Sequence, residues 1–292
     1  MKDLYINYKS NLNLAIKKMI VFFDLFDYPL SAFEIYIKLE KKYSLSNVFS
    51  ELDSLSLFIN KKNGFYFLNG REKLVELRQK RYNYSVRKIK VAKRYAKIFS
   101  LLPYVKVVTL ANVIGSHNMR DEGDIDFFII TSSGRLWLSR LFCAGLAKSL
   151  NKRPTKILKK DKLCLSFYIG DDNLNLDNLK IKPEDPYFDY WLKTMILLYN
   201  KKEVYEDFLS ANNLLENNES RKITLIRKNN NFLNNLEKIA KYIQLKIMPE
   251  ELRLVLKSSN GEFINDKILK LYWRDRNAEI LEKLNYVLNQ IA

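Results

Sequence analysis

Two aspartates separated by one residue, Asp124 and Asp126, have the type and spacing that suit metal chemistry. They open an apolar run, Asp124-Ile-Asp-Phe-Phe-Ile-Ile-Thr131, which predicts a β-strand. Residues i and i+2 of a strand point to the same side, so we expect both carboxylates to project from one face. Such hard oxygen ligands suit Mg²⁺ or Mn²⁺, and Mg²⁺ binds through one or two carboxylates together with substrate phosphates and water.

A second polar group precedes the aspartates at the end of another predicted strand. The run Val105–Ile114 is apolar and β-rich, and Gly115-Ser116 follows it. Gly115 permits a tight strand-to-helix turn, after which Ser116 and the following backbone N–H groups can hold a triphosphate at a helix start. His117 and Arg120 are further candidate phosphate ligands by position, although a polar first-turn residue is the plainer interpretation of His117. Together with the metal ligands, these donors would stabilise charge that develops on phosphorus.

These motifs lie in the order strand, Gly-Ser, strand, helix, strand, with the helix at about 135–150 and the last strand at 162–169. The segment Val105–Gly170 resembles the nucleotidyltransferase superfamily of DNA polymerase beta, poly(A) polymerases and kanamycin nucleotidyltransferase. Val113-Ile-Gly-Ser116 and Asp124-Ile-Asp-Phe-Phe-Ile-Ile130 carry this resemblance. It implies a polymerase-beta-like palm that uses an NTP as substrate and Mg²⁺ or Mn²⁺ as cofactor. An ordinary strand–helix unit with a surface aspartate pair is the alternative.

The last strand departs from the family pattern. Family members carry a third carboxylate there, which helps hold the catalytic metal ion and deprotonate the incoming hydroxyl. The matching stretch here is Cys164-Leu-Ser-Phe167, so Cys164 stands where that carboxylate belongs. A thiol is a poor ligand for Mg²⁺, so nucleotide binding is better supported than turnover. Asp161, Asp171 and Asp172 flank the strand and are the alternative sources of a third carboxylate.

The alternation of this strand predicts which side chains face the site. Cys164, Ser166 and Tyr168 would share the site face, and Leu163, Leu165, Phe167 and Ile169 the opposite face. The loop between Ser116 and Asp124 holds seven residues, fewer than family members commonly have. We therefore expect an altered triphosphate pocket.

Residues 1–70 predict a winged helix-turn-helix. A helix over 12–26, a helix capped by Ser31 with Glu34 three residues on, and a helix over 46–58 precede a hairpin over 59–68. The third helix has Asn47, Ser50, Glu51, Asp53 and Ser54 at its expected exposed positions and carries no Lys or Arg. A helix of this charge would be repelled by DNA phosphates, which favours protein docking over sequence-specific DNA binding. Lys61 and Lys62 in the hairpin leave non-specific contact open.

Residues 71–101 predict one long connector helix with an apolar stripe at Ile89, Ala92, Ala96 and Phe99. Its 71–97 part carries eleven basic residues against Glu72 and Glu76. This basic helix predicts contact with RNA or another polyanion, with interleaved tyrosines for base stacking. A solvated helix face is the alternative.

Residues 183–292 predict a helical C-terminal domain after the palm, which spans 102–182. The expected helices cover 187–200, 203–215, 230–247 and 264–290. Tyr187 and Tyr190 are candidates for stacking on a nucleotide base, with a place in the core as the alternative. The fold class is therefore α+β in four parts, and the layout resembles bacterial proteins that join a winged helix to a nucleotidyltransferase domain and whose function is unassigned.

Composition limits the function further. The 292 residues carry a formal net charge of +17, which favours a polyanionic partner, although a lysine-rich composition is the plainer alternative. Two cysteines and one histidine exclude a disulfide framework or a zinc cluster, and no apolar run is long enough for a membrane span. We expect a cytoplasmic, metal-dependent nucleotidyltransferase whose acceptor is an RNA, a protein or a small molecule. A weak or inactive nucleotide- or RNA-binding module is the first alternative, and a winged-helix DNA-binding regulator is the second.

Overall fold

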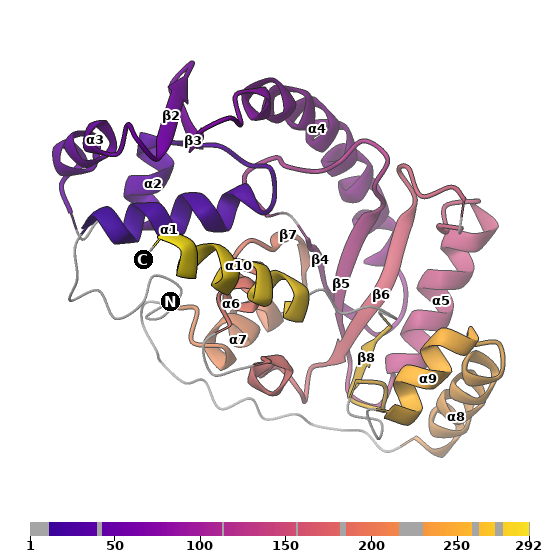
Figure 1. Ribbon diagram of the computed structural model, residues 1–292. Coiled ribbons are helices and arrows are strands. Elements are labelled where there is room, and N and C mark those ends of the chain that lie inside the picture. Colours follow the sequence, from indigo (N-terminus) through magenta and orange to yellow (C-terminus); the bar gives the residue numbers. More distant parts are fainter. Residues whose placement is uncertain are drawn as a thin grey trace.

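The computed structural model describes residues 12–39, 43–112, 114–155, 157–181, 185–215, 230–258, 263–271 and 277–291. Over these residues the chain forms ten α-helices, one short 3-10 helix over Asp177–Leu179 and two separate β-sheets (Figure 1). This confirms the α+β class. None of the helices in these ranges is long and apolar enough to cross a membrane.

Residues 12–68 form a unit that we call the N-terminal lobe. Its elements are α1 (Leu12–Asp24), β1 (Leu30–Ser31), α2 (Ala32–Lys38), α3 (Leu45–Ser54), β2 (Ile59–Lys62) and β3 (Phe65–Leu68). The predicted capping box is confirmed, because Ser31 Oγ accepts the Glu34 N–H and the Glu34 carboxylate accepts the Ser31 N–H. The predicted hairpin is confirmed too, with Asn63 and Gly64 both at positive φ in its turn. The strand β1 adds a third, unpredicted strand beside β3.

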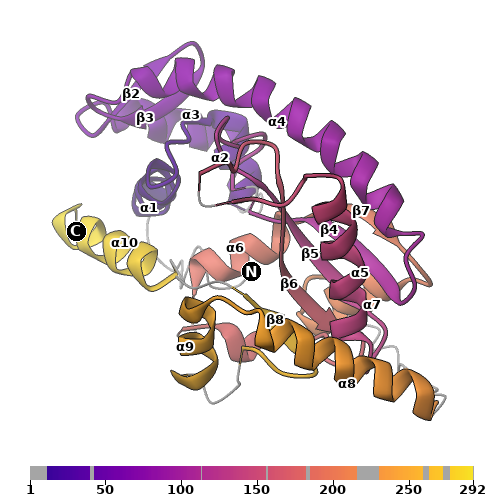
Figure 2. The same cartoon turned by 90° about the vertical axis from the view of Figure 1, so that its right-hand side faces the viewer.

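The predicted connector is α4 (Lys73–Phe99), an unbroken helix of 27 residues. At 1.5 Å per residue it is about 40 Å long, enough to run from the N-terminal lobe to the larger sheet (Figure 2). Ala92, Ala96 and Phe99 are buried against that sheet, and Ile89 packs beside them, so the predicted apolar stripe is confirmed.

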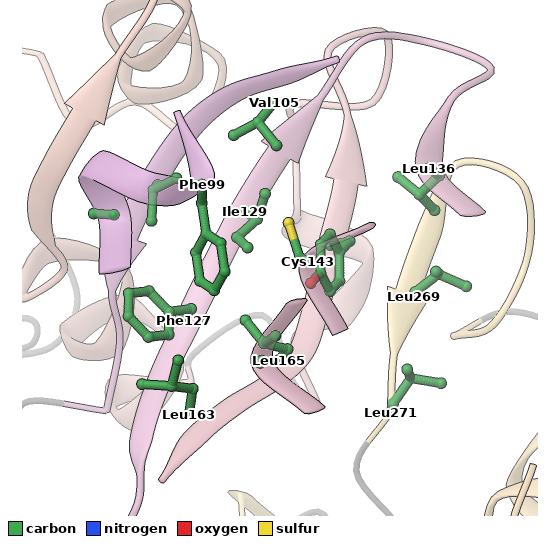
Figure 3. Packing of buried hydrophobic residues seen from close by; sticks show 14 of the residues in the cluster. Phe99, Val105, Phe127, Ile129, Leu136, Cys143, Leu163, Leu165, Leu269 and Leu271 are labelled. Carbon is green, nitrogen blue, oxygen red and sulfur yellow. The ribbon is translucent and has the colours of Figure 1, made fainter. Parts of the chain in front are cut away.

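The larger sheet has the strand order β7-β4-β5-β6-β8. Its strands are β4 (Val105–Leu110), β5 (Ile125–Thr131), β6 (Leu163–Gly170), β7 (Ile196–Asn200) and β8 (Ile268–Lys270). Only β5 and β6 run parallel, and α5 (Leu136–Ser149) forms the crossover that a parallel pair needs. Side chains of α4, α5 and α8 cover one face, where Phe99, Phe127, Ile129 and Leu165 meet (Figure 3). Side chains of α6 and α7 cover the other face.

The C-terminal part of the chain contains α6 (Pro186–Lys193), α7 (Val204–Ala211), α8 (Asn231–Lys246), α9 (Glu250–Ser258) and α10 (Asn277–Ile291). The prediction of purely helical structure here is wrong at two places. The helix expected over 187–200 ends at Lys193 and is followed by β7, and the region expected as a helix over 264–290 contains β8. Both strands are short apolar runs, whose period does not separate helix from strand, and pairing at the sheet edges decides their conformation.

Candidate functional site

The structure brings Asp124, Asp126 and Cys164 together. Asp124 immediately precedes β5, Asp126 is the second residue of β5, and Cys164 is the register partner of Asp126 on β6. One ligand atom from each side chain lies within 4.8 Å of the others, and all three residues are half-buried. The predicted convergence of two carboxylates with the residue at the third position is thus present.

The predicted faces of β6 hold through Ser166, whose Oγ lies beside Cys164 Sγ, and are wrong from Phe167 onward. Asp126 pairs with Cys164, whereas Phe128, two residues further along β5, pairs with Phe167, three residues further along β6. The extra residue in β6 is a β-bulge, which shifts the side-chain alternation by one position. Tyr168 therefore packs on the α5 side with Leu163 and Leu165, whereas Phe167 and Ile169 pack on the other face with Phe128.

The charge state of the cluster is set by burial. Burial, together with the nearby charge of Asp124, raises the pKa of Asp126 from 3.8 to about 6, although hydrogen bonds from Cys164 and Asn112 act in the opposite direction. Burial and the two carboxylates raise the pKa of the Cys164 thiol well above its usual range. Its Sγ lies 3.1 Å from Ser166 Oγ. Without a metal ion, Cys164 is thus a neutral thiol and cannot act as the base that a third carboxylate would supply.

The other aspartates do not take that third place. Lys88 Nζ lies 2.9 Å from Asp161 Oδ1, and Arg87 also binds this carboxylate. Asp171 and Asp172 lie at the far end of β6, where Ser133 donates its backbone N–H and its hydroxyl to them. The alternative that one of the three replaces the missing carboxylate is therefore wrong.

Basic residues form ion pairs with the acids around the cluster rather than with Asp124 and Asp126. Arg87 and Lys160 pair with Asp121, each at 2.6 Å, and the fully buried Lys88 also donates to the Gly123 carbonyl just before Asp124. Over the described ranges, no Lys or Arg forms an ion pair within 4.0 Å of Asp124 or Asp126. The two carboxylates thus have no direct ion pair among the described residues, although the buried charge of Lys88 acts on Asp126 from a greater distance and lowers its pKa.

The Gly115-Ser116 turn differs from the prediction. Gly115 has a φ of +81°, as the expected tight turn requires, but no helix lies between β4 and β5 in the residues described there. The following backbone is irregular, so Ser116 does not sit at a helix N-terminus. His117 also has a positive φ, its ring lies 4.8 Å from that of Tyr82, and its Nδ1 is 3.1 Å from Ser116 Oγ.

Two tyrosines hold the backbone of this turn. The Tyr28 hydroxyl accepts the Ser116 N–H at 3.0 Å, and the Tyr190 hydroxyl accepts the Gly115 N–H. Lys38 donates to the same Tyr190 oxygen at 2.9 Å. A Cβ at Gly115 would lie 2.8 Å from the Tyr28 ring. The backbone N–H groups of Gly115 and Ser116 are therefore already hydrogen-bonded to side chains.

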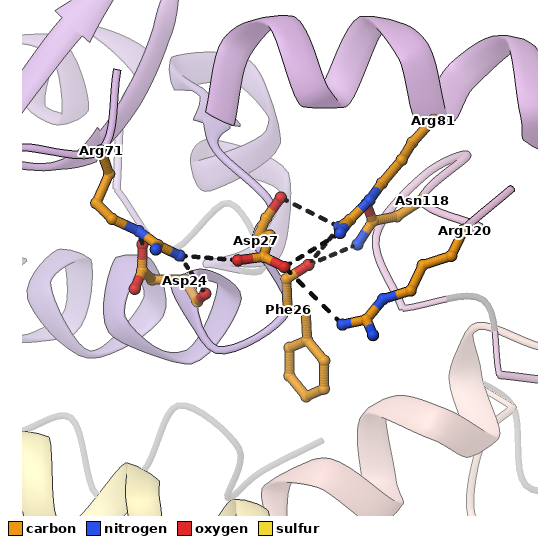
Figure 4. A network of polar contacts seen from close by, with 7 residues as sticks. All are labelled: Asp24, Phe26, Asp27, Arg71, Arg81, Asn118 and Arg120. Atoms are coloured by element: carbon orange, nitrogen blue, oxygen red, sulfur yellow. Dashed lines mark hydrogen bonds and ion pairs between the residues drawn. The ribbon is translucent and has the colours of Figure 1, made fainter. Parts of the chain in front are cut away.

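The Arg120 side chain extends toward Asp27 of the N-terminal lobe (Figure 4). Its guanidinium lies 3.9 Å from Asp27, and its side chain is about two-thirds exposed. Arg71 and Arg81 also pair with Asp27, and Asn118 donates to the Phe26 carbonyl. This network ties the loop that precedes β5 to the end of α1.

Tyr187 and Tyr190 both pack against aromatic side chains of the N-terminal lobe. Tyr190 is 6% exposed, with its ring 5.2 Å from that of Phe23, and Tyr187 stacks on Phe26 at 5.8 Å. Tyr190 thus takes the alternative place in the core, whereas Tyr187 is half-buried. The roles of Tyr28, Lys38 and Asn112 at this site were not predicted from the sequence. The position of Asn112, a polar residue inside the apolar run before Gly115, was the sequence feature that could have indicated its role.

Acidic residues from other parts of the chain neutralise about half of the basic residues over 71–97. Arg71, Arg78, Arg81, Arg87 and Lys88 bind carboxylates of the N-terminal lobe or of the loops beside β5 and β6. The remaining basic side chains of α4 are exposed: Lys73, Lys80, Lys90, Lys93, Arg94 and Lys97. About half of the basic side chains over 71–97 therefore remain exposed and available to a polyanion.

The cluster fits Mg²⁺ only in part. Asp124 and Asp126 supply the one or two carboxylates that Mg²⁺ takes from proteins, whereas Cys164 supplies a ligand that Mg²⁺ avoids. Searches of protein-family models, of curated proteins and of solved structures gave no match for this chain. The chemistry of this site therefore has to be argued from its own geometry.

Proposed function

We propose that this chain is a nucleotidyltransferase-type protein with a winged helix, a connector helix and a palm that acts on an NTP. The convergence of Asp124 and Asp126 with residue 164 of β6 is the observation that carries the proposal. The sheet supports it, because the Gly-Ser strand β4 is antiparallel to β5 and β5 is parallel to β6. The order α1, β1, α2, α3, β2, β3 supports the winged helix.

In this proposal each part of the site has a distinct task. Asp124 and Asp126 would hold a divalent metal ion, which supplies charge neutralisation for the phosphates of the NTP. The exposed Ser116 would offer its hydroxyl to the same phosphates. Lys88 fixes the backbone at Gly123 and so positions the first aspartate. The acceptor hydroxyl would lose its proton to solvent or to the phosphate, since residue 164 offers no carboxylate as a base.

The test is a binding and transfer assay on the full chain. We expect Mg-NTP to raise the melting temperature, since a ligand that binds only the native state stabilises it. The shift should vanish in Asp126→Asn and remain in Asp53→Asn, a control at an exposed acid of α3. Labelled NTP should yield a labelled acceptor. If no NTP changes the melting temperature and no label is transferred, the proposal is wrong.

A second candidate is a palm that binds nucleotide or RNA within an assembly without transferring a nucleotidyl group. Two observations favour it: Cys164 occupies the third position, and tyrosine hydroxyls occupy the amides of Gly115 and Ser116. It requires salt-sensitive RNA binding that survives Asp126→Ala. Loss of RNA binding in that variant would count against it.

The surface of the N-terminal lobe favours a protein partner over DNA. Asp53 is exposed on α3, and Phe33, Phe49 and Leu57 are large exposed apolar side chains of the same lobe, with exposed fractions of 58%, 43% and 96%. Exposed apolar side chains beside the acidic helix α3 suit a protein rather than phosphates. A DNA-binding regulator would instead lose duplex binding in Lys61→Ala/Lys62→Ala, and duplex binding at low salt is the measurement that separates the two.

A further inference from the structure

We propose that Asp124, Asp126 and Cys164 form a site for a thiophilic divalent metal ion of the zinc class, which they bind in preference to Mg²⁺. The proposal concerns the metal site of the proposed function and does not depend on nucleotidyl transfer. Its ligands are two carboxylate oxygens and one sulfur, from adjacent strands of one sheet. Mg²⁺ selects oxygen ligands, whereas zinc binds sulfur and carboxylate oxygen together.

The spacing of the three ligand atoms suits one small ion. They lie within 4.8 Å of one another before any ion is bound. Zinc bonds of about 2.3 Å to sulfur and about 2.0–2.2 Å to oxygen place tetrahedral ligands roughly 3.5 Å apart. Small rotations about the side-chain torsions therefore close the site without moving the strands. A fourth position stays open to water or to a phosphate oxygen.

The fold fixes the sulfur in this position. Cys164 is the direct register partner of Asp126, so Sγ and the carboxylate extend from the same face of two hydrogen-bonded strands. The bulge in β6 follows Cys164 and leaves this pairing intact, and Ser166 Oγ lies 3.1 Å from Sγ. The two cysteines of the chain differ in their surroundings. Cys143 of α5 is fully buried among apolar side chains, as is usual for a core cysteine, whereas Cys164 faces two carboxylates.

Charge gives an independent reason to expect a cation. The neighbouring acids Asp121 and Asp161 are each held by two basic residues. In the part of the chain that the structure describes, Asp124 and Asp126 have no such ion pair, although the chain carries 50 Lys and Arg residues. When the metal ion binds, the Cys164 thiol loses its proton to solvent and the ion receives three anionic ligands.

Metal titration of the full chain, freed of metal by a chelator and without nucleotide, tests the proposal. Co²⁺ should give a sulfur-to-cobalt charge-transfer band, and Zn²⁺ should displace it at one equivalent while excess Mg²⁺ should not. Cys164→Ser should abolish the band and weaken Zn²⁺ binding at least about 100-fold, since loss of an outer-shell partner alone costs 10–100-fold. Cys143→Ala is the matched control and should keep the band.

Cys164→Asp provides the opposite change. It restores a third carboxylate, so we expect the charge-transfer band to disappear and Mg²⁺ affinity to rise above that of the native chain. The proposal is overturned if the native chain shows no band with Co²⁺, or if Cys164→Ser keeps it. These outcomes are separable from failure of the proposed function: a band without nucleotidyl transfer contradicts only the transferase, and Mg²⁺-dependent transfer without a band contradicts only the thiophilic site.

Discussion

The hydroxyl of Tyr28, at the end of the first helix–strand connection, accepts the backbone N–H of Ser116 at 3.0 Å and donates to Glu34 at 2.8 Å. Tyr28 and Ser116 are 88 positions apart in the sequence. Glu34 is in turn held by both terminal nitrogens of Arg78 on α4. The Gly-Ser turn is therefore connected through one phenol to the N-terminal lobe and to the connector helix.

Removing only the Tyr28 hydroxyl tests this connection. Tyr28→Phe leaves the Ser116 N–H without its partner, and we expect a loss of about 1–2 kcal/mol in the free energy of unfolding, measured in urea. If the phenol competes with phosphate for this N–H, the same variant binds Mg-NTP more tightly. Tyr168→Phe is the control, because the buried Tyr168 hydroxyl contacts only the weakly hydrogen-bonding Cys143 thiol and holds no backbone N–H group among the described residues. Equal losses in both variants would contradict the connection.

A methyl group at Gly115 tests the close approach of the Tyr28 ring. Gly115→Ala meets the ring at 2.8 Å, and Gly70→Ala meets nothing within 4 Å although both glycines have a φ of +81°. The backbone cost is thus the same, about 1–2 kcal/mol. We expect Gly115→Ala to lose a further 1–3 kcal/mol or so from overpacking in chemical denaturation. Equal destabilisation of the two variants would show that the ring moves aside freely.

Neutralising the exposed end of α4 tests contact with RNA. We expect Lys90, Lys93, Arg94 and Lys97→Gln to weaken single-stranded RNA binding and to lower the slope of log affinity against log salt by up to about 3, with little change in stability. The charge-matched control replaces exposed lysines elsewhere with Gln: Lys201, Lys202, Lys257 and Lys267. Equal weakening by both sets would mean that only net charge matters.

The pH dependence of stability should report the burial of Asp126. Its pKa is raised to about 6 in the folded chain from an ordinary 3.8, so the folded state binds more protons than the unfolded state between these values. Stability without metal must therefore fall as the pH rises from about 4 to 6. Asp126→Asn removes this term, and the difference between the two unfolding free energies should grow across that window. If the difference in unfolding free energy between the native chain and Asp126→Asn does not change with pH, the Asp126 carboxyl is exposed to solvent rather than buried.

Structural features that depend on residues close together in the sequence were predicted correctly. Ser31 with Glu34, and Asn63 with Gly64, each act within four residues, and the structure confirms the cap and the turn. The convergence of Asp124 and Asp126 follows from the two-residue period of a strand, which is also local. The single bulge in β6 was invisible because it appears only when β6 is paired with β5, and it reversed the predicted side for Tyr168.

Interactions between distant parts of the sequence account for the other differences. The hydroxyls of Tyr28 and Tyr190 both contact the Gly-Ser turn, although Tyr28 lies far before the turn in the sequence and Tyr190 far after it. Neither tyrosine carries a local sequence signal for that role. The basic residues of α4 look like one surface in the sequence, yet Arg78 and Lys88 are bound by acids that lie far away in the chain. Charge counts alone cannot separate paired from exposed side chains.

The placement of β7 and β8 at the two edges of the larger sheet has a consequence during synthesis on the ribosome. The strands that they cover, β4 and β6, emerge long before them, whereas the N-terminal lobe is complete at Leu68. Each nascent chain therefore carries unpaired strand edges until Lys270 has been added, and such edges pair readily with other chains. A ribosome that stalls before Ile268 would release a chain with β6 uncovered, which should aggregate even though Asp124, Asp126 and Cys164 have all been made.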